Sequence, residues 1–291
     1  MSLQKIKEDI KSIKWDFDGT NTSYYTHGIH PYPAKFIPQI AENFLRILSK
    51  PGDFIWDPFC GSGTTGLESL LAGCNSINTD INPLSKIIGT AKTTKISSGI
   101  DKELEEMIHS LQNISLDSYD KNEPMKFIPD IPNMQHWFSK NVVDELALIR
   151  CEISKMKNPK SKNIALTSFS KIITSVSYQL EETKYSSKEK YVEPRTCIHK
   201  FIISLKFIIK KLHELKPKIG KNKIIFETHN CLDNLSNSKQ LHLGDECIDV
   251  IITSPPYPNT TDYFLYNRFR LFWLGYDPKA MGKIEVGSHL R

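Results

Sequence analysis

Hydrophobic residues in the first third of the chain come in short runs that are separated by turn residues. Phe54–Trp56 is a short apolar run, and Ser76–Thr79 is a second short segment, which contains Ile77 and ends at Asp80. Between them, Leu67, Leu70 and Leu71 recur at the spacing of a helix. The order strand, helix, strand is the unit from which parallel sheets are built.

The middle of the chain has the periodicity of helices, and the end returns to short strands. Ile224–Phe226 and Val250–Ile252 are the predicted strands of the last part. Apolar residues recur every three or four positions between residues 97 and 222, which indicates helices with one buried face. The positions that carry this prediction are Val142, Leu146, Ile149, Ile153, Met156, Phe169, Ile172, Ile173, Val176, Ile198, Phe201, Ile202, Leu205, Ile208, Ile209, Leu212 and Leu215.

This alternation predicts an α/β fold in which a doubly wound sheet is interrupted by helices. We expect residues 1–96 to form the first part of the sheet domain and residues 97–222 to form an inserted helical subdomain. Residues 223–291 then return to the sheet domain.

Composition limits the class of protein further. With 291 residues, of which 39% are hydrophobic, the chain can bury a core, which excludes wholesale disorder. It has no run of about 18 apolar residues and no apolar segment of signal-peptide type at its start, so we expect a cytoplasmic protein without a membrane span. The six cysteines form no CxxC pair, and His27 and His30 lack further metal ligands. We therefore expect reduced thiols and no metal site.

The positive charge is unevenly distributed along the chain. The formal net charge is +5, but twelve Lys and Arg residues against three Glu give a local net of +9 between Lys184 and Lys223. Including Glu181 and Glu182 lowers this to +7. A basic block in a near-neutral chain suggests a polyanion as partner, and a solvated helix face is an equally good explanation.

A glycine-rich turn joins the first predicted strand to the helix after it. The segment Asp57–Thr65 reads Asp-Pro-Phe-Cys-Gly-Ser-Gly-Thr-Thr. Glycines at such a place allow a sharp turn and let a ligand lie against the main chain. No lysine follows them, so a nucleotide phosphate loop is not expected, and we also set aside the dinucleotide pattern GxGxxG. An ordinary strand-to-helix turn is the alternative to a ligand site.

Asp80 ends the next predicted strand, 17 residues after Gly63. In doubly wound sheets an acidic residue at this place accepts hydrogen bonds from ribose hydroxyls. The alternative is that Asp80 caps the helix in whose first turn Pro83 lies. Gly63 and Asp80 together indicate a cofactor that carries a nucleoside.

The segment Thr253–Tyr257, Thr-Ser-Pro-Pro-Tyr, directly follows the last predicted strand. Ligands bind at these strand ends in open α/β sheets. Two prolines stiffen the segment and leave main-chain carbonyls free, while Ser254 adds a hydroxyl and Tyr257 a flat aromatic face. These groups favour a planar ligand with an exocyclic amine. The alternative is a proline-rich turn without function.

Together these motifs resemble those of the S-adenosylmethionine-dependent amino-methyltransferases of DNA. Asp57–Thr64 resembles the cofactor motif of that family. Ser254–Tyr257 resembles its catalytic (D/N/S)PP(Y/F) motif in the serine form, which is most often seen in enzymes that make N4-methylcytosine. His30–Phe36 resembles the segment that closes over the methionine end of the cofactor, and Asp233 matches an acidic position near the adenine.

The resemblance covers about residues 1–95 and 224–275 and implies a Rossmann-like methyltransferase sheet. It implies S-adenosylmethionine as cofactor and double-stranded DNA as substrate. The implied catalytic residues are Ser254, Pro255, Pro256 and Tyr257. The implied cofactor-binding residues are His30, Pro33, Ala34, Lys35, Phe36, Asp57, Phe59, Gly61, Gly63, Thr64, Asp80, Asn82 and Asp233.

The resemblance also implies a mechanism. An exocyclic amine is a poor nucleophile because its lone pair is delocalised into the ring. The Ser254 hydroxyl and the Pro255 carbonyl would hold the amino hydrogens, so that the lone pair faces the methyl carbon of the cofactor. The base would be flipped out of the duplex and stacked on Tyr257. Forming 5-methylcytosine instead needs a cysteine nucleophile, usually in a Pro-Cys pair, and the sequence contains no such pair.

We therefore expect a site-specific DNA cytosine-N4 methyltransferase of restriction-modification type, with a cognate restriction endonuclease as its counterpart. Adenine-N6 methylation is the nearest alternative. A tRNA guanine-N2 methyltransferase is weaker, because Ser254 stands where that family has an aspartate. A DNA-binding subunit without catalytic activity is the remaining alternative.

The catalytic motif lies close to the end of the sequence. Only 34 residues follow Tyr257, although further strands are expected after the catalytic strand in this order of motifs. Val250–Ile252 would then be an unpaired sheet edge. We expect an incomplete methyltransferase, either truncated or completed by a second polypeptide. The basic stretch Lys184–Lys223 is expected to hold the DNA backbone, with salt-sensitive binding.

Overall fold

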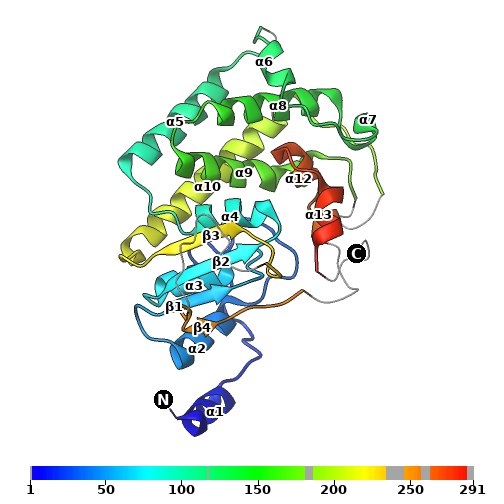
Figure 1. The fold of residues 1–291 in the computed structure, drawn as a ribbon. Coiled ribbons are helices and arrows are strands. Elements are labelled where there is room, and N and C mark those ends of the chain that lie inside the picture. The colour runs from blue at the N-terminus through cyan, green and yellow to red at the C-terminus, as the bar shows by residue number, and fades with distance from the viewer. Residues whose placement is uncertain (1, 117, 181–185, 234–245, 257–262, 287–291) are drawn as a thin grey trace. The chain divides into compact units, whose positions relative to one another are not determined.

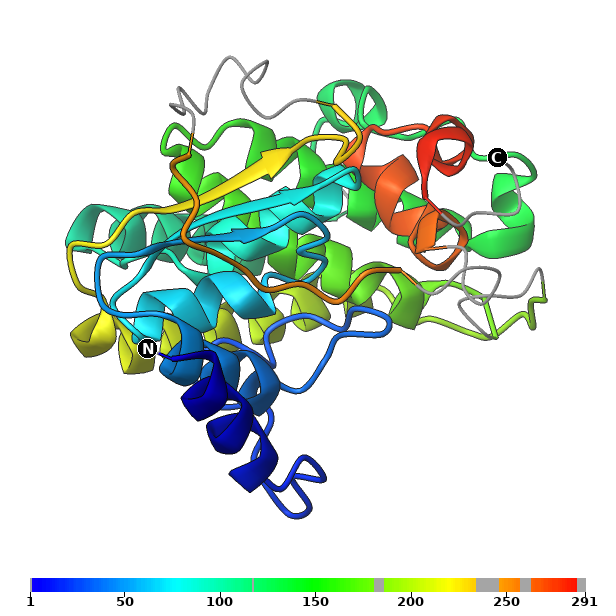
Figure 2. The same cartoon turned by 60° about the horizontal axis from the view of Figure 1, so that its bottom comes forward.

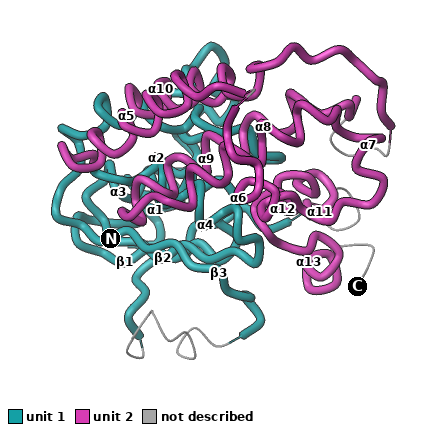
Figure 3. The backbone as a smooth tube through the Cα atoms, turned by 90° about the horizontal axis from the view of Figure 1, so that it is seen from above, with its two compact units in different colours: residues 1–95, 212–256 teal, residues 96–211, 257–291 magenta. Residues whose placement is uncertain are grey.

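The computed structural model describes residues 2–116, 118–180, 186–233, 246–256 and 263–286 (Figure 1). The chain divides into two compact units, each built from two separate segments (Figure 3). Unit 1 comprises residues 1–95 and 212–256, and unit 2 comprises residues 96–211 and 257–291. The residues after 256 thus cluster with the helices, whereas the division into 1–96, 97–222 and 223–291 stays a prediction.

Unit 1 contains a parallel sheet, in which four strands lie in the order β3-β2-β1-β4 within the described residues. Strands β1, β2 and β3 run side by side in Figure 2. The predicted α/β fold with a Rossmann-like parallel sheet is confirmed, and a strand is found at each of the four predicted places. Their bounds are Phe54–Asp57 for β1, Asn75–Asp80 for β2, Ile224–Thr228 for β3 and Val250–Ile251 for β4.

Helices α2 (Pro38–Leu48), α3 (Thr64–Leu71) and α4 (Pro83–Lys92) of unit 1 bury apolar side chains. The remaining helix of this unit, α1 (Leu3–Ser12), contacts α2 and has no buried residue. Leu45 of α2 packs with Ile55 of β1 and with Ile252, all of them buried. Leu67 and Leu70 of α3 form a second cluster around Leu215.

The outer strand β4 is the least covered part of the sheet. Within the described residues it pairs with β1 alone, and Ile251 is 56% exposed. An exposed strand edge presents main-chain groups that another strand can pair with. The expectation of further strands stays a prediction.

Unit 2 is helical. Its helices are α5 (Ser98–Asn113), α6 (Asn122–Met125), α7 (Met134–Trp137), α8 (Lys140–Ser154), α9 (Pro159–Val176), α11 (Tyr263–Tyr266), α12 (Arg268–Leu274), α13 (Pro278–Ile284) and most of α10 (Thr196–Leu215), whose last turn, followed by the 3₁₀ helix η1 (Lys216–Lys218), belongs to unit 1. Edge-to-face ring contacts link Trp273 to Phe138 and Phe169, with centroids 6.0 and 6.3 Å apart. No helix among the described residues is both long and apolar enough to cross a bilayer.

The start of α10 is held by a carboxylate from another helix. Glu145 of α8 is buried and accepts hydrogen bonds from the main-chain N–H groups of Arg195, Cys197 and Ile198, at 2.6, 3.0 and 3.3 Å. These donors would otherwise lack partners at the first turn of the helix. Glu145 therefore fixes where α10 begins.

Candidate active site

The order of the strands marks the place where a ligand is expected. From β1 the chain continues to β2 and β3 on one side, whereas β4 lies on the other side of β1. In open parallel sheets ligands bind outside the carboxyl ends of the strands where the order reverses in this way. The glycine turn follows β1, and the Thr253–Tyr257 segment follows β4, so both predicted loops start at this switch point.

A short hydrogen bond joins the two loops. The hydroxyl of Thr253 donates to Asp57 Oδ1 over 2.6 Å, although the residues are 196 positions apart in sequence. A longer bond runs from Thr65 Oγ1 to the carbonyl of Ile252, 3.4 Å. Ser254 and Pro256 are half-buried and Pro255 is exposed, while Tyr257 lies outside the described residues. The structure thus brings the cofactor motif and the first residues of the catalytic motif together.

Asp57 is a buried carboxylate at this junction. Its side chain is 1% exposed, and Oδ1 also accepts from the N–H of Phe59, 3.2 Å. Burial raises the pKa of Asp57 to about 6. Its second oxygen, Oδ2, is buried and has no hydrogen-bond partner in the described part of the chain. A buried carboxylate oxygen without a donor is costly, and a cationic or hydrogen-bonding ligand group would relieve that cost.

The glycine turn has the backbone shape that glycine permits. Gly61 and Gly63 have φ of +47° and +76°, in the left-handed region. The N–H of Gly61 donates to Asp80 Oδ2 over 2.7 Å, and the N–H of Cys60 donates to the carbonyl of Thr79 over 3.0 Å. The end of β2 therefore anchors the turn.

Gly66 completes the GxGxxG spacing with Gly61 and Gly63, so setting that pattern aside was wrong. A Cβ atom at Gly66 would lie 2.6 Å from the ring of Phe226, and one at Gly89 would lie 2.3 Å from it. The third glycine therefore lets helix α3 pack closely against β3, which is the role it has in dinucleotide-binding folds.

Asp80 holds the turn rather than capping the next helix. Its Oδ2 accepts from Gly61, and its Oδ1 accepts from the N–H of Asn82 over 2.9 Å. Burial raises the pKa of Asp80. The helix cap is Asn82, whose side chain accepts from Leu84 N over 3.0 Å, so the alternative of Asp80 as the N-cap is wrong.

The end of β3 also reaches this place. The N–H of His229 donates to the carbonyl of Asp80 over 2.9 Å. Asp233 follows four residues later, is exposed, and lies in the same turn, where its carbonyl contacts His229 Nε2 at 3.2 Å. The residue proposed for the adenine thus lies on a loop that is tied to Asp80.

The segment His30–Phe36 covers the glycine turn through a residue that was not predicted. A Cβ atom at Gly61 would lie 3.1 Å from the ring of Tyr32. The Tyr32 hydroxyl shares a hydrogen bond with Ser85 Oγ of α4, 3.0 Å. Of the predicted residues, His30 is buried, Pro33 and Phe36 are half-buried, and Ala34 and Lys35 are exposed. Tyr32 of this segment therefore lies beside the turn, and the closure of the segment over a cofactor stays a prediction.

A buried cluster of charged residues lies behind the glycine turn. Glu68 Oε1 accepts from the Tyr24 hydroxyl over 2.7 Å and shares a hydrogen bond with His27 Nε2 over 2.6 Å. Lys92 is fully buried, and its ammonium donates to Ser62 Oγ of the turn over 3.4 Å. Burial raises the pKa of Glu68 to about 7 and lowers that of Lys92 to about 7.

Burial also lowers the pKa of His27, to about 2, so this imidazole is neutral and forms a hydrogen bond with Glu68 rather than an ion pair. Sequence reasoning missed this cluster. The one sequence signal was a glutamate placed between the apolar positions Leu67 and Leu70 of a helix.

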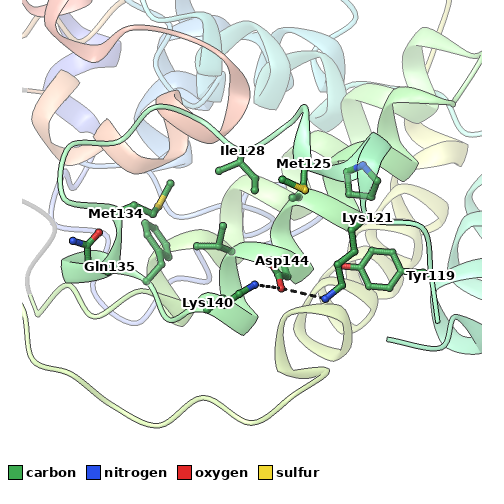
Figure 4. Close-up of a pocket in the computed structure, with 12 residues that line it drawn as sticks. Tyr119, Lys121, Met125, Ile128, Met134, Gln135, Lys140 and Asp144 are labelled. Atoms are coloured by element: carbon green, nitrogen blue, oxygen red, sulfur yellow. Dashed lines mark hydrogen bonds and ion pairs between the residues drawn. The ribbon is translucent and has the colours of Figure 1, made fainter. Parts of the chain in front are cut away.

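Unit 2 has a separate hollow of about 350 Å³ (Figure 4). Its wall is mainly apolar, with Met125, Ile128 and Met134, and it carries a Lys140–Asp144 ion pair of 3.0 Å. None of the predicted site residues lines it. The hollow is therefore distinct from the loops at the switch point.

Comparisons with known proteins match this arrangement. Residues 3–88, which include β1, the glycine turn and β2, match the family model described as DNA methylase. The chain is 29% identical over 279 residues to the type II methyltransferase M.MvaI of Kocuria varians, covering 89% of this chain and 59% of that protein. It is 26% identical over 289 residues to the type II methyltransferase M.BsoBI of Geobacillus stearothermophilus, covering 91% and 56%.

A third relative matches over a shorter stretch. The type II methyltransferase M.MjaII of Methanocaldococcus jannaschii is 37% identical over 121 residues, which are 42% of this chain and 18% of that protein. The chain spans about three-fifths or less of the length of these relatives. The motifs at the switch point and the comparisons agree: residues 3–88 match the DNA methylase family model, and most of the chain is similar to type II methyltransferases.

Proposed function

We propose that this chain transfers a methyl group from S-adenosylmethionine to the exocyclic N4 amine of cytosine in double-stranded DNA, as the modifying activity of a restriction-modification system. The observation that carries the proposal is the 2.6 Å hydrogen bond between Thr253 and Asp57. It joins the end of β4 to the end of β1. A methyl donor held by the glycine turn after β1 and a base held by the loop after β4 would therefore meet.

The residues around the glycine turn fit the cofactor. Gly61 and Gly63 give the turn its left-handed backbone shape, and the unpartnered Oδ2 of Asp57 offers an acceptor for a cationic group. Asp80 would hold the ribose and Asp233 would lie near the adenine. His30, Pro33, Ala34, Lys35 and Phe36 would cover the methionine end, while Phe59, Thr64 and Asn82 would complete the site. The cofactor would supply an electrophilic methyl carbon on a sulfonium.

The catalytic loop would prepare the amine. The Ser254 hydroxyl and the Pro255 carbonyl would accept its hydrogens and turn the nitrogen lone pair toward the methyl carbon. The nitrogen–carbon bond forms as the carbon–sulfur bond breaks, the bonding pair stays on sulfur, and the amine releases one proton. Pro256 would stiffen the loop, and Tyr257 would stack on the flipped base.

Analysis of methylated nucleosides tests the proposal. The chain is incubated with duplex DNA and isotopically labelled S-adenosylmethionine, and the DNA is then hydrolysed to nucleosides. N4-methyldeoxycytidine is the expected product, and resistance of the DNA to a cognate endonuclease should follow. N6-methyldeoxyadenosine would move the assignment to adenine, a choice that the serine form of the motif disfavours. Absence of labelled nucleoside both with the isolated chain and with protein purified from its native host would overturn the proposal.

The variant Ser254→Ala separates catalysis from cofactor binding. It is expected to bind S-adenosylmethionine as the wild type does, measured by calorimetry, and to lose methyl transfer. Ser118→Ala, at an exposed position of unit 2, is the matched control and should keep both. An unchanged transfer rate in Ser254→Ala would remove the role given to this hydroxyl.

We also infer that a second polypeptide pairs with the exposed edge of β4. The support is the 56% exposure of Ile251 and the pairing of β4 with β1 alone among the described strands. Peptides covering residues 249–252 should exchange amide hydrogens faster in the isolated chain than in protein purified from its native host. Equal exchange in the two preparations would remove this partner.

A further inference from the structure

Three lysines of unit 2 gather where helix α9 meets the segments that follow it. The Lys190 ammonium donates to the carbonyl of Ser175 over 3.2 Å, and the Lys200 ammonium donates to Ser175 Oγ over 3.3 Å. One serine near the end of α9 therefore holds two positive charges, one from the loop before α10 and one from α10 itself.

The third lysine lies one turn earlier on the same face of α9. Lys171 precedes Ser175 by four residues, which is a rise of about 6 Å along the helix. Its ammonium lies 4.8 Å from the centre of the Phe207 ring of α10. Phe207 is 37% exposed, and Ile203, one turn before it, is 69% exposed. We call Lys171, Lys190 and Lys200, with Phe207 beside them, the lysine patch.

No carboxylate neutralises the lysine patch in the described part of the chain. The ion pairs found there involve other lysines, among them Lys102, Lys126 and Lys155 of unit 2, each paired with a glutamate. Partial burial lowers the pKa of Lys190, and the positive charge of Lys200 lowers it further. Like charges held together without a counter-charge are unfavourable, and an anionic partner would relieve this.

The contacts also distinguish the lysine patch from an ordinary solvated helix face. On such a face, ammonium groups extend into water or pair with acids one turn away. Here two of them are fixed on Ser175 and one lies over an aromatic ring. Lys171 lies outside the basic stretch Lys184–Lys223, so the fold adds a charge that the sequence does not place beside the others.

We propose that the lysine patch binds the phosphate backbone of duplex DNA and is a sequence-independent holding surface of unit 2. This proposal rests on the proposed function, because it assigns the lysine patch of unit 2 to the DNA substrate of that function. Lysine is suited to this contact because its ammonium is a point charge that meets phosphate without reading bases.

Salt dependence of binding tests the proposal in the full chain. The variant changes Lys171, Lys190 and Lys200 to Gln together. The matched control changes Lys102, Lys126 and Lys155 to Gln, which removes the same charge from the same unit where glutamates already neutralise it. Affinity for a non-specific duplex is measured by fluorescence anisotropy across a series of salt concentrations.

Each lost phosphate contact lowers the slope of log affinity against log salt by about 0.9, so three contacts lower it by about 2.7. Between about 50 and 200 mM salt, the affinity of the wild type should then fall about forty-fold more than that of the lysine-patch variant. The control should keep the slope of the wild type. A third variant with Arg at the three patch positions keeps the charge and should also keep the slope.

The outcomes separate this proposal from the proposed function. A lysine-patch variant with the slope of the control overturns the proposal, and so does a wild type that does not bind duplex DNA. Loss of slope in the Arg variant as well would mean that the lysines act through folding, which also overturns it. Loss of binding to vesicles of anionic lipid, with DNA binding unchanged, would assign the surface to a membrane instead. If the wild type binds DNA with the expected slope but transfers no methyl group, also when purified from its native host, the proposed function is overturned and the lysine-patch proposal is not affected.

Discussion

Replacing Asp57 by Asn tests whether the buried, ionised carboxylate of Asp57 destabilises the folded chain. Asp57 is 1% exposed, and burial raises its pKa from 3.8 to about 6. A difference of about two pKa units corresponds to about 3 kcal/mol. Because the folded state holds the proton more tightly, the contribution of Asp57 to stability falls as the pH rises from about 4 to about 6. Above that range the folded chain bears the full cost of a buried carboxylate.

Asparagine cannot ionise, but its side-chain oxygen can still accept from Thr253 and from the N–H of Phe59. We therefore expect Asp57→Asn to gain about 3 kcal/mol of unfolding free energy relative to the wild type between pH 4 and pH 7.5. Titrating groups that do not interact with Asp57 affect both proteins alike, so they cancel in the difference.

Urea unfolding at the two pH values measures this difference. A short pulse of amide hydrogen exchange, read in peptides from β1 and β2, reports on unit 1 alone. Asp16→Asn, at an exposed position, changes the charge equally and serves as the control. The same Asp57→Asn variant should bind S-adenosylmethionine more weakly, because the neutral amide attracts a cationic group less. A stability difference that does not vary with pH would refute the electrostatic reasoning.

Three further substitutions test other parts of the structure. Gly63→Ala should lower the free energy of unfolding by about 2–4 kcal/mol, because it places a Cβ at φ +76° and 2.9 Å from the ring of Phe226. The control Gly52→Ala, at φ +95° with open space around it, should lower it by only about 1–2 kcal/mol. Equal shifts of the urea midpoint in the two variants would contradict this. Glu145→Ala should cost about 3 kcal/mol or more in unit 2, because three N–H groups, two of them buried, lose their acceptor. Glu145→Gln should cost less, and equal losses in exchange-detected urea unfolding would argue against the capping role. Since burial lowers the pKa of Lys92 from 10.5 to about 7, the wild type should gain stability relative to Lys92→Met as the pH rises from about 7 to about 10, and the opposite trend in urea unfolding would show that Lys92 stays charged in the folded chain.

Local patterns were sufficient to predict the strands and the two loops of the site. The apolar runs at Phe54–Trp56 and Val250–Ile252 identify strands by composition alone, and the residues after them carry the motifs. Parallel strands place these residues at one edge of the sheet, and this is why Thr253 and Asp57 meet.

Features that depend on contacts across the fold were not predictable in this way. Glu68 and Lys92 come from different helices, and no local pattern shows that both are buried behind the turn. Whether Asp80 or Asn82 caps α4 depends on which of the two side chains already accepts a hydrogen bond from the glycine turn. The packing of Gly66 against Phe226 joins two segments 160 positions apart, so the reason for the third glycine appears only in the structure.

The pairing of β1 with β4 has a consequence for how the protein is made. The ribosome releases β1 long before β4, and the helices of residues 96–211 emerge in between. One side of β1 therefore lacks its partner strand until more than a hundred intervening residues have been synthesised. Contacts so distant in sequence form late and slowly. The Thr253–Asp57 bond cannot form before Thr253 has been synthesised, so a half-synthesised chain carries the glycine turn without this bond.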